Sequence, residues 1–80
     1  MILLLDSILD DISKSLWIRN RLKSTKTKGG YLVVNVPYEL SESYEIEEMV
    51  QMSLEEITEK YDVYLDYELF LDKVKIYILD

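Results

Sequence analysis

The sequence predicts an α+β fold of two layers, in which two helices pack on one face of a small three-stranded sheet. Two segments with helical periodicity are separated by a short β-branched segment, and an alternating β-hairpin pattern ends the chain, giving the order α-β-α-β-β. Eighty residues without a linker indicate one domain, residues 1–80. Apolar content of 49% with two glycines and one proline indicates a folded chain despite a net charge of −7.

A first helix is expected within residues 2–24, where apolar side chains recur at steps of three and four residues. An alternative start is Ser7, because Ser7 and Asp10 have the spacing of a capping box. Residues 2–5 would then be extended and could form an extra strand. The helix propensity of leucine favours the longer helix. The apolar face of that helix comprises Met1, Leu5, Ile8, Leu9, Ile12 and Leu16.

Residues 24–30 are expected to form a loop, because they include no apolar residue and end in two glycines. Residues 31–36 are rich in β-branched side chains and are followed by Pro37, which indicates a short strand that ends there. Leu32, Val34 and Val36 would share one face of that strand.

A second helix follows, with Ser41 or Ser43 as its N-cap. The capping-box spacing of Ser53 and Glu56 permits an alternative, in which this helix breaks in two and the chain forms a winged helix. No glycine or proline marks such a turn, and the exposed acids of the second half would repel DNA. The buried stripe of an unbroken helix comprises Ile46, Met49, Val50, Ser53, Leu54, Ile57 and Tyr61.

The last part of the chain, residues 63–79, has the alternating pattern of a β-hairpin. With Leu71 and Asp72 at the turn, every apolar residue of the inner face finds an apolar partner across the hairpin. The expected pairs are Leu69 with Val74, Tyr67 with Ile76 and Leu65 with Ile78, and on the outer face Glu68 with Lys75 and Asp66 with Tyr77.

The chain has few of the groups that catalysis requires. It has no cysteine and no histidine, which excludes disulfides, thiolate metal sites and the commonest general base. No nucleophile-elbow, P-loop or dinucleotide-binding motif is present. Adjacent glutamates on a helix diverge by about 100°, which does not suit a pair that converges on a substrate. The sequence therefore predicts a protein that is not an enzyme and has no catalytic residues, cofactor or metal.

The apolar start of the chain, residues 1–5, lacks the basic flank and the cleavage site of a signal peptide. No apolar run reaches the roughly 20 residues that a membrane-spanning helix needs. The sequence predicts a cytoplasmic protein without a membrane partner.

Charge is distributed unevenly along the chain. Residues 1–28 carry six bases and three acids, whereas residues 29–80 carry three bases and thirteen acids. Within the second helix Glu55 and Glu59 form a repulsive pair, and only Glu56 and Lys60 form a favourable pair of that spacing. Because these acids do little to stabilise their own helix, we expect a partner there. The candidate partner-binding residues on this helix are Glu47, Glu48, Glu55, Glu56 and Glu59.

Aromatic side chains give two further candidate surfaces. Trp17 lies away from the apolar face of the first helix, with Lys14 and Arg21 one turn away on either side. It could make a cation–π contact, lie beneath the 24–30 loop, or anchor an interface, and we include it among the candidate partner-binding residues. The outer face of the hairpin carries Tyr64, Phe70 and Tyr77, which could form a dimer interface.

The composition resembles that of the small acidic inhibitors that viruses make against host defence or transcription machinery. The sequence predicts a binding protein that blocks a basic, nucleic-acid-handling host complex by nucleic-acid mimicry or by steric obstruction. If the protein is viral, we expect it to act in the host cytoplasm. Direct nucleic-acid binding is opposed by the net charge of −7. The alternative is a structural or regulatory homodimer, in which the acids serve solubility and the hairpin tyrosines or residues 1–5 form the interface.

Overall fold

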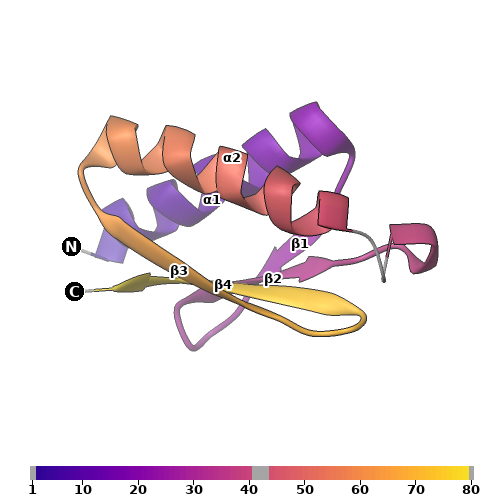
Figure 1. The fold of residues 1–80 in the computed structure, drawn as a ribbon. Coiled ribbons are helices and arrows are strands. Elements are labelled where there is room, and N and C mark those ends of the chain that lie inside the picture. Colours follow the sequence, from indigo (N-terminus) through magenta and orange to yellow (C-terminus); the bar gives the residue numbers. More distant parts are fainter. Residues whose placement is uncertain (1, 41–43, 80) are drawn as a thin grey trace.

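The computed structural model of the chain describes residues 2–40 and 44–79. Two helices lie on one face of a four-stranded antiparallel sheet (Figure 1), with strand order β1-β2-β4-β3. The predicted α+β class is confirmed, but the sheet has four strands rather than three. In chain order the elements are α1 (Ile2–Asn20), β1 (Ser24–Lys26), β2 (Tyr31–Asn35), the 3₁₀ turn η1 (Tyr38–Leu40), α2 (Tyr44–Tyr61), β3 (Tyr64–Leu69) and β4 (Lys73–Leu79).

Helix α1 begins at Ile2, so the alternative start at Ser7 is wrong. The helix ends at Asn20, because Arg21 adopts a left-handed backbone conformation with φ of 59°. The Arg21 amide donates to the Trp17 carbonyl oxygen at 2.9 Å, which is the bond expected of a left-handed C-cap. An arginine rather than a glycine occupies this position, and for that reason the sequence carried no stop signal. Met1, which was assigned to the apolar face, lies outside the described residues.

Strand β1 corrects the prediction of a loop over residues 24–30. It pairs with β2 in the register Ser24 with Val34 and Lys26 with Leu32. Its helix-facing side chains bind polar groups of α1: Ser24 Oγ donates to Ser13 Oγ at 2.7 Å, and Lys26 Nζ lies 2.9 Å from an Asp10 carboxylate oxygen. This edge strand therefore forms without an apolar side chain, and the sequence pattern did not reveal it.

The two central strands, β2 and β4, supply the sheet side of the core. Leu32 pairs with Ile76 and Val34 with Val74, and all four side chains are fully buried. The predicted register of the C-terminal hairpin is confirmed for each apolar pair and for both polar pairs. Period-two alternation thus specifies the register, because a shift by one residue would move the apolar set to the opposite face.

Helix α2 runs unbroken through Ser53, so the winged-helix alternative is wrong. The predicted buried stripe is confirmed, since each of its residues is buried or packs against the core. Ser53 is 0% exposed and accepts a hydrogen bond from Ser15 Oγ at 3.0 Å, where α1 meets α2. The predicted caps Ser41 and Ser43 lie outside the described residues. The helix ends at Tyr61, because the next residue, Asp62, adopts a left-handed backbone conformation with φ of 55°.

Candidate functional site

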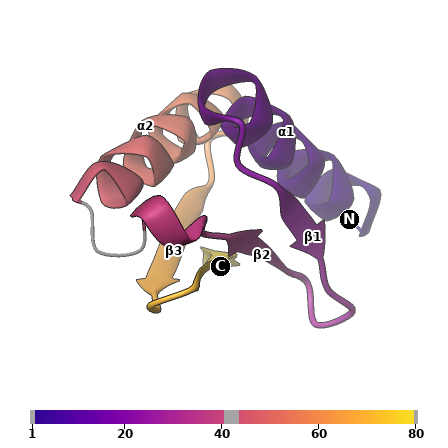
Figure 2. The same cartoon turned by 90° about the vertical axis from the view of Figure 1, so that its right-hand side faces the viewer.

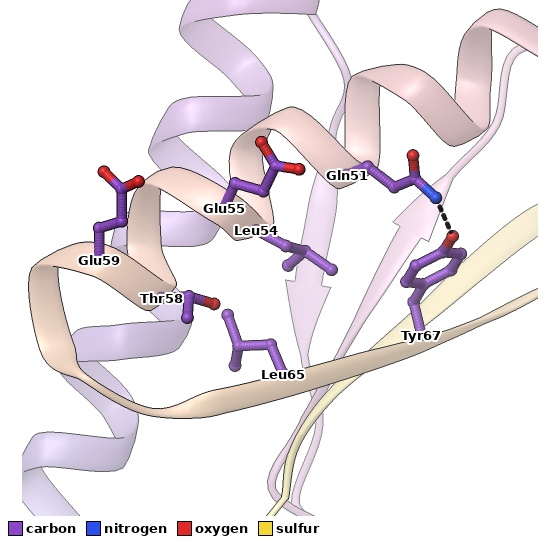
Figure 3. Close-up of a pocket in the computed structure, with 7 residues that line it drawn as sticks. All are labelled: Gln51, Leu54, Glu55, Thr58, Glu59, Leu65 and Tyr67. Carbon is purple, nitrogen blue, oxygen red and sulfur yellow. Dashed lines mark hydrogen bonds between the residues drawn. The ribbon is translucent and has the colours of Figure 1, made fainter.

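One face of α2 carries three exposed acids. Glu48, Glu55 and Glu59 are exposed, and the carboxylates of Glu55 and Glu59 are directed away from β3 (Figure 3). At a rise of 1.5 Å per residue, Glu48 and Glu55 are about 10 Å apart along the axis, and Glu55 and Glu59 about 6 Å. Within the part of the chain that the structure describes, these three side chains form no ion pair or hydrogen bond. We call them the acidic face.

A shallow groove of about 510 Å³ lies between the acidic face and β3. Leu54, Thr58 and Leu65 form its floor, and Gln51 reaches across it to Tyr67 (Figure 3). Gln51 Nε2 donates to the Tyr67 hydroxyl at 2.7 Å. This hydrogen bond joins α2 to the edge strand β3 beside the acidic face.

Glu47 lies on the β3 side of α2 rather than on the acidic face. Its Oε2 atom accepts a hydrogen bond from the Tyr67 hydroxyl at 3.2 Å, and the residue is partly buried. Tyr67 thereby links Glu47 to Gln51, one helical turn away. This candidate residue has a partner within its own chain.

Glu56 lies on the opposite side of α2, against α1. Arg19 donates to its Oε2 atom from Nε at 3.1 Å and from Nη2 at 2.7 Å. The sequence paired Glu56 with Lys60 along the helix, but Lys60 Nζ instead lies 2.9 Å from Asp11 on α1. Tertiary packing has therefore replaced one pair within α2 by two pairs between the helices.

The second of these helix–helix contacts is a three-residue cluster. Asp11 accepts hydrogen bonds from both the Tyr61 hydroxyl and Lys60 Nζ. The Tyr61 hydrogen bond, followed by the one from Lys60, lowers the pKa of Asp11 below its ordinary value of 3.8. The same contacts raise the pKa of Tyr61 and of Lys60. The cluster keeps its charges paired around neutral pH, and it joins the C-terminal end of α2 to α1.

A second hollow of about 510 Å³ adjoins the acidic face where α2 passes the C-terminal end of α1. Met49 and Met52 give it an apolar surface, and Glu45, Glu48 and Arg19 border it. Met52 is 56% exposed and lies within one turn of both Glu48 and Glu55. Sequence reasoning missed Met52, although its spacing from these two acids was visible there.

Trp17 is not part of the acidic face. It is 43% exposed and lines a separate hollow beside β1, together with Ser13 and Lys23. The Arg21 guanidinium carbon lies 5.4 Å from the centroid of its ring, a cation–π distance. Among the six candidate residues, Glu48, Glu55 and Glu59 share one surface, whereas Glu47, Glu56 and Trp17 face three other neighbours.

No protein-family model matches the chain, and no curated protein is significantly similar to it in sequence. Among the described residues, no cluster of three or more acids suits a metal ion. Neither helix, over the part described, is long and apolar enough to cross a membrane.

Proposed function

We propose that this protein is a small acidic binding protein without enzymatic activity, which docks the acidic face of α2 on a basic protein surface. The observation that supports this most strongly is the division of the glutamates on α2. Glu47 and Glu56 have partners within the chain, whereas Glu48, Glu55 and Glu59 are exposed and unpaired among the described residues. Water and counter-ions compensate these three charges in the free protein, and a basic partner surface would replace them on binding.

The energetics of the helix support the same conclusion. Glu55 and Glu59 repel each other at i,i+4 spacing, at a cost of about 0.2–0.5 kcal/mol. Glu59 also lies in the last turn of α2, where the helix dipole disfavours negative charge. The repulsion and the dipole both indicate that these acids do not serve the stability of their own helix, which supports a role in binding.

The partner that we propose belongs to a host complex that handles nucleic acid. This chain would inhibit that complex in the host cytoplasm, as viral inhibitors of host defence do. Carboxylates spaced along a rigid helix present negative charges in a row, as phosphates do along a nucleic-acid strand. Lysine and arginine side chains that bind phosphates could therefore bind these carboxylates.

Met52 favours a protein as the partner. An exposed methionine among acids gives an apolar contact for the aliphatic stems of lysine and arginine. Methionine and arginine are both enriched at protein–protein interfaces, which suits a contact between Met52 and a basic partner surface.

The proposal can be tested by affinity capture with a charge-reversed variant. In the test variant Glu48, Glu55 and Glu59 become lysine, and in the matched control Asp6, Glu39 and Asp72 become lysine. All six positions are exposed, so both variants change the net charge equally. We expect the wild type to capture a nucleic-acid-binding protein, and duplex DNA to reduce the amount captured. The test variant should capture at least tenfold less of that protein than the wild type, and the control should capture the same amount.

Equal capture by the two variants would show that net charge or another surface mediates binding, and would contradict the proposal. Capture that is insensitive to a DNA competitor would refute the proposed class of partner while leaving the acidic face as the binding surface. Circular dichroism of each variant verifies that the fold is retained.

A further inference from the structure

The face of the sheet opposite the helices carries ordered aromatic and charged side chains. No described element covers this face (Figure 2). Because side chains alternate along a strand, those that point away from the helices come from every second position. We call this set the open face: Tyr31, Val33 and Asn35 on β2, Lys73, Lys75, Tyr77 and Leu79 on β4, and Tyr64, Asp66 and Glu68 on β3.

Side chains of the open face are held in cross-strand rows. Tyr31, Tyr77 and Asp66 form one row, and the adjacent row contains Lys75 and Glu68. Lys75 Nζ lies 4.5 Å from the centroid of the Tyr31 ring. Partial desolvation, with the nearby carboxylates of Asp66 and Glu68, raises the pKa of Tyr77. These contacts order the face before any partner binds, which lowers the entropic cost of docking.

Charge on the open face is balanced, unlike that of the whole chain. Lys73 and Lys75 offset Asp66 and Glu68, so the net charge of −7 resides on the rest of the molecule. For two identical chains of net charge −7, close approach is least repulsive at a neutral surface. The open face is such a surface, whereas the acidic face on the helix layer is not.

The arrangement of these charges is also self-complementary. The acids lie on β3 and the bases on the neighbouring β4, with Lys75 directly across from Glu68. A two-fold axis that runs along the strands between β3 and β4 would place Glu68 of the partner subunit over Lys75. The same axis would place Asp66 of the partner subunit over Tyr77. A two-fold dimer requires this kind of self-complementary patch.

We propose that a second copy of the chain binds the open face and forms a two-fold dimer with the two sheets packed face to face. Such a sandwich has the sheets about 10 Å apart, with the helix layers outside. It covers exposed apolar groups such as Tyr64, which is 76% exposed. Each acidic face stays accessible, so the dimer does not depend on the proposed function.

Sedimentation equilibrium of the full chain over a range of micromolar concentrations tests the dimer. We expect twice the chain mass of 9.5 kDa for the wild type. Lys75→Glu or Glu68→Lys alone should raise the dimer dissociation constant at least tenfold, because like charges then face each other across the axis. The double exchange of both residues should restore it. Lys28→Glu, which makes the same charge change as Lys75→Glu but on an exposed loop, serves as the control.

Tyr64→Glu is a second test that does not depend on the charge pair. Because Tyr64 is largely exposed, the variant should fold normally and sediment as a monomer. A monomeric wild type at every concentration would overturn the proposal. A dimer that tolerates Lys75→Glu and Tyr64→Glu as well as it tolerates Lys28→Glu would overturn it too, because its interface would then lie elsewhere.

Discussion

Replacing Ser53 by alanine tests how the two helices are held together. Ser53 is fully buried, Ser15 is 9% exposed, and the bond between their hydroxyls is 3.0 Å long. Loss of one such bond costs about 1 kcal/mol, and up to about 3 kcal/mol if the remaining hydroxyl is left unsatisfied. Because Ser15 lies within a helix, its hydroxyl can turn to the carbonyl four residues earlier, which places the cost near 1 kcal/mol.

The companion variants isolate the hydrogen bond from the packing. Replacing both serines by alanine removes both polar groups, so we expect a loss close to that of one single variant and a coupling energy of about 1 kcal/mol. Ser53→Leu should cost about 1–3 kcal/mol, because the close helix contact has no room for a larger side chain. Ser7→Ala, on the exposed side of α1, should not lower the stability, because alanine has the higher helix propensity.

Thermal and urea unfolding, followed by circular dichroism, measure these differences. In a domain of this size 1 kcal/mol corresponds to a shift in melting temperature of about 4–8 °C. Two results would refute the reasoning, because the serine pair would then not couple the helices. One is a melting temperature of Ser53→Ala equal to that of the wild type, and the other is a loss of stability in the double variant equal to the sum of the losses in the two single variants.

Two other variants probe the contacts at the ends of the helices. Asp11→Asn should cost about 0.5–1 kcal/mol at neutral pH, since Lys60 loses its ionic partner. Because the pKa of Asp11 is lowered in the folded state, the difference in the free energy of unfolding between the wild type and Asp11→Asn should be complete above pH 3.8 and disappear as the pH falls through the lowered pKa. Urea unfolding of both proteins at several pH values measures this difference. A difference that does not change with pH would contradict the prediction. Asp62→Gly should raise the stability by about 0.5–1 kcal/mol, because φ is 55° at this position and glycine adopts a positive φ without steric cost. Glu59→Gly lies within the helix and should lower the stability by about 1 kcal/mol. Melting temperatures that fall for both glycine variants would refute the assignment of strain to Asp62.

Elements with strong apolar periodicity could be predicted from the sequence. The hairpin register was correct to the residue, because each inner apolar side chain has one partner that keeps it buried. Helix α2 and its buried stripe were correct for the same reason. Strand β1 could not be predicted, since polar contacts from Ser24 and Lys26 to α1 hold it in place of apolar burial. The end of α1 at Arg21 was also missed, because an arginine rather than the usual glycine adopts the left-handed conformation there.

For the candidate site too, local spacing could be predicted from the sequence and contacts between distant residues could not. Helical spacing alone placed Glu48, Glu55 and Glu59 on an outward face. It could not show that Glu47 and Glu56 bind Tyr67 and Arg19, which are distant in sequence.

What the sequence by itself determined is therefore the set of faces: which side of each helix and strand is apolar, and where uncompensated acid lies. Those faces follow from local periodicity, because residues three or four apart in a helix, or two apart in a strand, share a side. Only the tertiary structure decided which charges have partners and which sheet face stays open. Both depend on contacts between residues far apart in the chain, and such contacts leave no periodic signal.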